Sequence, residues 1–203
     1  MPRRRLTVET APNADLVATA IMKNFLRVDA DDENALIDSL VDAATAHLDG
    51  PNGILGRALI TQVWNLSLDR FPVYSATNPW EAISIPLPPL QSVQSITYVD
   101  TAGATQTLAS SVYTVDIASQ PGRVYPAYNQ EWPEVRDIPN AVTIQFTAGY
   151  GDAASNVPDT IITAVKQMVA HWFDNRPAVE IGTIATEVPM GVRRLLAPYM
   201  IRP

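Results

Sequence analysis

Hydrophobic residues recur with a period of two over residues 60–150, whereas the segments on either side have the period of a helix. Within the stretch ITQVWNLSLDRFP, Trp64, Leu66 and Leu68 alternate with polar residues, which is typical of a strand with one buried face. Similar short runs follow, and turn signals such as DTAG at 100–103 separate them. We therefore expect a small antiparallel β module in the middle of the chain.

Helices are predicted on both sides of this module. Apolar residues form a modest stripe over 16–21 and a clear one over 36–48. After Pro158, one continuous helical face is lined by Ile161, Ile162, Val165, Met168, Val169, Trp172 and Phe173. A short last helix is expected around residues 192–197. The pattern predicts an α+β protein, a small α-helical bundle with an inserted antiparallel β module.

The predicted domain boundaries follow these changes of period. Residues 1–59 and 151–187 form the bundle, residues 60–150 form the β module, and residues 188–203 form a C-terminal docking tail.

Composition limits the chemistry. The chain of 203 residues contains no cysteine, which excludes disulfides, thiolate metal sites and cysteine nucleophiles. A net charge of −7 argues against an extended surface that neutralises nucleic-acid phosphates. No apolar run approaches the roughly 20 residues of a membrane span, and no apolar segment follows the basic start as in a secretory signal. We expect a soluble protein of cytoplasmic origin.

The segment MVAHWFDNRP at 168–177 gathers His171 and Asp174 near one helix end. At about 100° per residue, Asp174 points away from the apolar stripe and His171 lies at its edge, so no sheltered catalytic pair results. A structural helix terminus is the favoured interpretation. His47 is expected to be a packed side chain, since a metal pair with His171 has no evident third ligand.

Two further motifs do not support a site. The acidic run DADDE at 29–33 starts like a calcium loop, but Asn34 and Leu40 occupy the positions where that loop needs glycine and glutamate. Asp29 or Asp31 is instead expected to cap the following helix. AGYGDAA at 148–154 lacks the lysine and spacing of a phosphate loop, and we expect a strand-to-helix turn. No catalytic, cofactor or metal residue is predicted.

The C-terminal segment reverses the local charge. No acidic residue follows Glu187, yet three arginines alternate with large apolar residues. Two interpretations remain open: the segment folds back onto its own acidic chain, or it docks onto another protein.

Several segments together resemble one known family. They are, in order, LRVDADDENALIDSLVDAA, GRALITQVWNLSLDRFP, IPLPPLQSVQSITYVDTAG, YTVDIASQPGRVYP, WPEVRDIPNAVTIQFTAGYGD, VPDTIITAVKQMVAHWFDNRPAV and GVRRLLAPY. Over about residues 26–199 they resemble the head-tail connector proteins, also called adaptor or head-completion proteins, of tailed phages and phage-like gene transfer agents.

The resemblance implies a structural protein without catalysis. Such proteins assemble in the bacterial host cytoplasm as a homo-oligomeric ring of roughly twelve subunits at the virion neck. The ring binds the portal protein above and a tail or stopper protein below, and double-stranded DNA passes through its lumen. An acidic chain suits that passage, because a negative lumen does not hold phosphates. The implied portal-binding residues are Arg193, Arg194, Leu195, Leu196, Tyr199 and Arg202.

Two alternatives belong to other classes of protein. One is a monomeric module whose β insertion binds a glycan or peptide through Trp132, Tyr125 and Tyr128. The other is a small hydrolase or lyase that uses His171 with Asp174 or His47.

Overall fold

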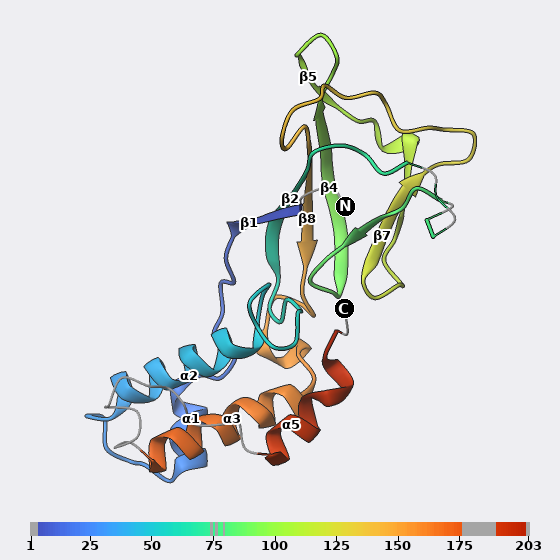
Figure 1. Cartoon of the computed structure of the whole chain (residues 1–203). Coiled ribbons are helices and arrows are strands. Elements are labelled where there is room, and N and C mark those ends of the chain that lie inside the picture. The colour runs from blue at the N-terminus through green and yellow to red at the C-terminus, as the bar shows by residue number, and fades with distance from the viewer. Residues whose placement is uncertain (1–3, 74, 76, 79, 176–189, 202–203) are drawn as a thin grey trace. The chain divides into compact units, whose positions relative to one another are not determined.

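The computed structural model describes residues 4–73, 75, 77–78, 80–175 and 190–201. Contacts divide the chain into two compact units (Figure 1). The β unit comprises Met1–Ala11 and Thr61–Gly149, and the helical unit comprises Pro12–Ile60 and Tyr150–Pro203.

The β unit contains two antiparallel sheets. The five-stranded sheet has the order β1 (Arg4–Thr10), β2 (Gln62–Leu68), β8 (Val142–Ala148), β4 (Leu90–Val99) and β5 (Thr105–Thr107). The three-stranded sheet has the order β3 (Ile83–Ile85), β7 (Gly122–Pro126) and β6 (Tyr113–Asp116), and the 3-10 helix η1 (Ser110–Val112) precedes β6. Together with the helices described below, these two antiparallel sheets confirm the predicted α+β fold class.

The central pairing of β2 with β8 builds the core of this unit. Trp64 lies opposite Phe146 and Leu66 lies opposite Ile144, and all four side chains are buried. The alternation read in the sequence therefore marks the buried face correctly. The predicted DTAG turn is also present, where Gly103 has a φ of 92° and its N–H donates to the carbonyl oxygen of Asp100.

Strand β1 was not predicted. It pairs with β2 from Arg4 opposite Leu68 to Thr10 opposite Val63, with a shift of register after Val8. Six of its seven residues are exposed, and only Leu6 is partly buried. Its only apolar residues, Leu6 and Val8, are too few to mark a strand in the sequence, and it is held mainly by its backbone ladder.

The helical unit is built on four α-helices in the described part of the chain. These are α1 (Thr19–Leu26), α2 (Asn34–Leu48), α3 (Asp159–Asp174) and α5 (Met190–Leu196), and the 3-10 helices are η2 (Ala154–Asn156) and η3 (Ala197–Tyr199). The predicted stripe of α3 is its buried face: Ile161, Val165, Met168, Val169 and Trp172 all belong to the core. Helix α3 packs against α2 and against α5.

The observed division differs from the predicted one at both ends of the chain. The sequence predicts that residues 1–59 belong to the bundle, but the pairing of β1 with β2 brings Met1–Ala11 into the β unit. The predicted separate tail at 188–203 includes α5, which packs within the helical unit. None of the helices in the described ranges combines the length and apolar character that a bilayer span requires.

Replacing Phe146 with alanine should destabilise the β unit. The side chain is fully buried, and deleting a buried aromatic ring costs about 3–5 kcal/mol of unfolding free energy. Urea unfolding of Phe146→Ala compared with Tyr128→Ala measures the difference. Tyr128 is 92% exposed, so its variant should stay within about 0.5 kcal/mol of the wild type. Equal effects of the two substitutions would contradict the assigned core.

Candidate docking surface

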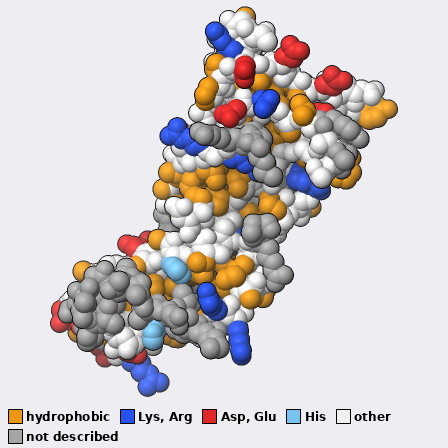
Figure 2. All heavy atoms as spheres, viewed as in Figure 1, with side chains coloured by type: hydrophobic (Ala, Val, Ile, Leu, Met, Phe, Trp, Pro, Cys, Tyr) orange, Lys and Arg blue, Asp and Glu red, His pale blue; other side chains and the backbone are white. Residues whose placement is uncertain are grey.

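Helix α5 attaches to the helical unit through one face. Val192 and Leu196, one helical turn apart, are buried in the same hydrophobic core as α3. At about 100° per residue, Arg194 points about 180° away from the midpoint of these two residues, and Arg193 about 80°. Both arginines are exposed. On the surface where Figure 1 places α5, Figure 2 shows basic side chains close to hydrophobic ones.

The residues after α5 are fastened to the loop that follows α2. The N–H of Ile201 donates to the carbonyl oxygen of Leu55 at 3.1 Å. Arg57, only 6% exposed, donates from Nε to the carbonyl oxygen of Tyr199. Gly56 has a φ of 62°, and a Cβ on it would lie 3.6 Å from the Cβ of Ile201. We call Leu55, Arg57, Tyr199 and Ile201 the C-terminal clasp.

The loop that carries the clasp is itself fixed. The N–H of Gly50 donates to the carbonyl oxygen of Arg57 at 2.7 Å, and the N–H of Leu59 donates to Oδ1 of Asp49 at 2.7 Å. Burial raises the pKa of Tyr150, and the hydrogen-bonded Arg57 guanidinium opposes that rise. Tyr150 therefore stays a neutral phenol beside the clasp at physiological pH.

The sequence-predicted portal residues separate into different environments. Arg193 and Arg194 are exposed, Leu195 and Tyr199 are partly buried, and Leu196 is fully buried. Leu196 cannot contact a partner while α5 stays packed. Arg202 lies outside the described residues. Of the two interpretations left open, the structure shows the segment folded onto its own helical unit, with the two arginines still facing solvent.

The histidines do not form a reactive pair in the described part of the chain. His171 is partly buried at the end of α3, with Nδ1 3.4 Å from Nδ2 of Asn175, and Asp174 is exposed as predicted. His47 is exposed, so the prediction of a packed side chain is wrong. It lies about 80° from the centre of the buried stripe of α2, which is enough to reach solvent. The described residues include no group of three His, Asp or Glu able to hold a metal ion.

The acidic run before α2 does not cap that helix as predicted. Glu33 is the N-cap residue and makes no side-chain capping bond. Asp31 accepts instead from Nζ of Lys23 at 2.6 Å, and this hydrogen bond holds the pKa of Asp31 below its ordinary value. The turn at 148–154 joins β8 to α3 through Gly149 and Gly151, both at positive φ, and confirms the predicted strand-to-helix turn.

The aromatic residues of the β unit differ from the predicted platform. Trp132 is partly buried, stacks on Phe71 at 4.6 Å between centroids, and donates to the carbonyl oxygen of Glu81. Its role is therefore structural. Tyr128 is exposed as the platform required, but the exposed tryptophan is Trp80, which the sequence reasoning missed.

Trp80 lies beside the guanidinium group of Arg123, which hydrogen bonds hold in one orientation. The Cζ atom of Arg123 lies 5.9 Å from the ring centroid of Trp80. Arg123 donates to Oδ2 of Asp116 at 2.8 Å and to Oγ of Ser119 at 3.0 Å. Hydrogen bonds from Ser119 and then from Arg123 hold the pKa of Asp116 well below its ordinary value. An exposed tryptophan next to an oriented arginine is typical of residues that dominate binding at protein interfaces.

Replacing Arg57 with methionine should release the C-terminal clasp. The carbonyl oxygen of the partly buried Tyr199 loses its donor, and an intramolecular hydrogen bond contributes about 0.5–1.5 kcal/mol. Hydrogen exchange followed by mass spectrometry should show faster exchange over residues 196–201. The matched Arg194→Met, at an exposed arginine, should exchange like the wild type. Unchanged exchange in Arg57→Met would contradict the clasp.

Replacing Asp116 with asparagine should lower the melting temperature of the β unit in a pH-dependent way. The folded pKa is depressed from 3.8, so the ionised carboxylate stabilises the fold above about pH 3.8. That contribution disappears as the pH falls towards the folded pKa. The difference from the wild type should therefore be largest near pH 7 and shrink below pH 3.8. Asp137→Asn, at an exposed residue of the same unit, is the control; a pH-independent difference in Asp116→Asn would exclude the mechanism.

Comparison with known proteins identifies chains of the same fold. No protein-family model and no curated protein matches the sequence. A chain in the virion of a native gene transfer agent particle aligns at 24% identity with a TM-score of 0.74, over 98% of this chain and 96% of that chain. A chain in the neck of the empty particle, computed with C6 symmetry, aligns at 22% identity with a TM-score of 0.71 and covers 98% and 97%.

A third match comes from the neck of the native particle computed with C12 symmetry. It has 21% identity and a TM-score of 0.68, and covers 98% of this chain and 97% of that chain. These matches confirm the fold that the resemblance to gene transfer agents implied. Both units of the chain thus share the fold of proteins found in the virion and neck of gene transfer agent particles.

Proposed function

We propose that the chain is a structural component of the neck of a phage-like particle, where copies form a ring between the portal and the tail. The supporting observation is the match in fold over 98% of the chain to virion and neck chains. A ring of about twelve copies follows the C12 symmetry of one matched neck. Rings of this kind arise when one patch of each subunit contacts a different patch of the next.

The charge of the chain suits a channel for DNA. A net charge of −7 gives the ring little means of neutralising phosphates, so double-stranded DNA would slide through the lumen and would not be held there. The function needs no cofactor, metal or catalytic residue. A hydrolase using His171 has no support from the geometry, because Asp174 and His47 are both exposed and offer no sheltered partner.

The portal contact in this proposal is the exposed surface of α5 and η3. Arg194 supplies its outward charge, and the partly buried Leu195 and Tyr199 supply apolar area beside it. Arg202 adds a further basic residue in the sequence but lies outside the described residues. The clasp holds this surface in one conformation, so binding does not require the segment to be ordered first.

The tail or stopper contact is assigned to the β unit. Trp80 is 65% exposed, and Arg123 is oriented beside it by Asp116. Trp80 would contact the next protein of the neck. In this proposal the ligand of the β unit is therefore a protein of the particle, and not the glycan or peptide of the alternative hypothesis.

Replacing Arg194 with aspartate should weaken binding to the portal without unfolding the helical unit. Truncation of residues 188–203 is a poor test, because it removes Val192 and Leu196 from the core. A point substitution at an exposed arginine avoids this. We expect about tenfold or greater loss of affinity in co-sedimentation with portal rings, since avidity multiplies a small loss per copy.

The control is Arg27→Asp, which makes the same charge change at another exposed arginine of the helical unit. It should bind the portal like the wild type. Undiminished binding by Arg194→Asp would exclude the proposed portal surface, and no binding by the wild type would exclude the neck function.

A further inference from the structure

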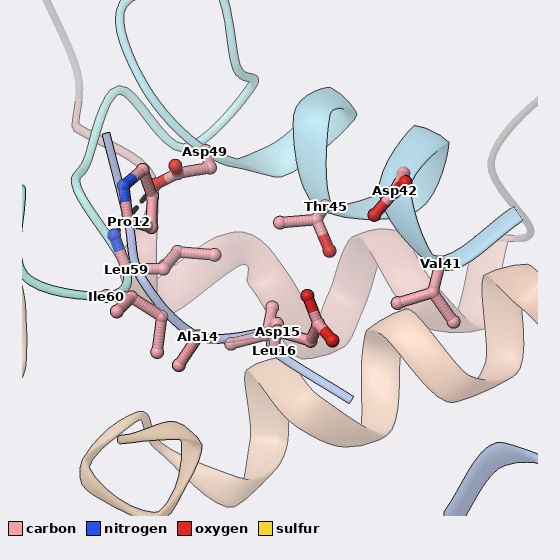
Figure 3. Close-up of a pocket in the computed structure, with 10 residues that line it drawn as sticks. All are labelled: Pro12, Ala14, Asp15, Leu16, Val41, Asp42, Thr45, Asp49, Leu59 and Ile60. Carbon is pink, nitrogen blue, oxygen red and sulfur yellow. Dashed lines mark hydrogen bonds between the residues drawn. The ribbon is translucent and has the colours of Figure 1, made fainter. Parts of the chain in front are cut away.

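The helical unit contains a pocket of about 190 Å³ between α2 and the segment that precedes α1 (Figure 3). Its walls include Leu16, Val41 and Leu59, and its polar groups include Asp15, Asp42 and Thr45. We call it the acidic pocket. No role in the proposed portal or tail contacts has been assigned to it.

The acidic pocket contains one buried hydroxyl without a partner in the described part of the chain, whereas Asp49, which also lines it, accepts from the N–H of Leu59. The hydroxyl oxygen of Thr45 is buried and has no hydrogen bond. In Figure 3 this hydroxyl points towards the carboxylate of Asp15 across the pocket, and Asp42 lies on the next turn of α2. Neither Asp15 nor Asp42 takes part in an ion pair among the described residues. A buried oxygen left without a hydrogen-bond partner is costly, and here it lies beside two carboxylates that belong to exposed residues.

These polar groups determine which chemical group can bind in the acidic pocket. Two carboxylates and a hydroxyl oxygen can all accept hydrogen bonds, so the bound group must present several N–H donors and a positive charge. A guanidinium group fits best, because its planar fork donates up to five hydrogen bonds in fixed directions. The apolar walls suit the methylene stem of an arginine side chain.

The exposed arginines of α5 are cations without an acidic partner in the described residues. Arg194 points straight out and belongs to the proposed portal surface. Arg193 projects from the flank of α5, about 80° from its buried face. Arg193 is not among the residues that line the acidic pocket of its own chain.

We propose that Arg193 of one copy inserts into the acidic pocket of the next copy, as the polar contact that joins neighbouring helical units in the ring. The contact pairs two different surfaces of one rigid unit, so it repeats from copy to copy and closes into a ring at the right angle. This inference rests on the proposed ring. It assigns Arg193 to ring closure and leaves Arg194 for the portal.

Charge reversal at either side should break the contact. Sedimentation velocity over a concentration series, for the protein alone and with portal rings, measures assembly. For Arg193→Asp and for Asp42→Arg, we expect the concentration for half-assembly to rise about tenfold or more, since like charges then face each other. The double variant carrying both substitutions restores an opposite pair and should recover most of the assembly.

Two controls separate this contact from general charge effects. Arg27→Asp makes the same change at an exposed arginine that belongs neither to the portal surface nor to the pocket, and it should assemble like the wild type. Asp174→Arg makes the same change as Asp42→Arg at an exposed carboxylate of α3 outside the pocket and should also assemble normally.

The proposal is overturned if the double variant assembles no better than the single variants, or if Arg27→Asp impairs assembly as strongly as Arg193→Asp. A wild-type chain that stays monomeric both alone and on the portal also overturns it. The neck function fails separately, through absence of portal binding by the wild type. Circular dichroism of each variant verifies that its fold is retained.

Discussion

Burial of the apolar face of α3 is the interaction on which the helical unit depends. The side chains of this face pack against α2 and against α5, and they include Met168 and Val169, both fully buried. A seven-residue helix such as α5 is too short to be stable alone in water. It persists because Val192 and Leu196 join the core of α3 and because Arg57 fixes the carbonyl group that follows. The exposed arginines of α5 are thereby presented on a fixed surface.

Because α5 is already fixed on the helical unit, the C-terminal segment can bind a partner without first becoming ordered. A free tail would lose conformational freedom on every binding event, whereas a clasped helix has already lost it in folding. A single exposed ion pair contributes little, about 0–1 kcal/mol. In the proposed ring, repetition would multiply such contributions, so modest contacts at α5 and at the acidic pocket would support a stable assembly.

The elements that the sequence predicts well are those with a strong buried period. Seven apolar residues mark α3, and the alternation of Trp64, Leu66 and Leu68 marks β2, because burial on one face imposes the pattern directly. The hydrophobic pattern does not predict strand β1, because six of its seven residues are exposed. His47 is exposed although the sequence predicts a packed side chain. It lies about 80° from the centre of the buried stripe of α2, near the boundary between buried and exposed positions of a helix.

The candidate site was less accessible to sequence reasoning than the fold. The reversal of charge after Glu187 draws attention to Arg193 and Arg194, but it does not show that Leu196 turns inward. Asp15, Asp42 and Thr45 come from two segments that only the tertiary structure brings together, and no spacing in the sequence relates them. Trp80 was overlooked because a lone tryptophan in a loop looks the same whether it packs inward or projects outward.

The central claim is that this chain forms a neck ring with α5 still packed on α3. Cryo-electron microscopy of intact particles carrying the protein tests it most directly. The account predicts a ring of copies between the portal and the tail, with density for Val192 and Leu196 in the helical core and Arg194 directed at the portal. A neck without this chain, or copies in which α5 has left α3, would contradict it.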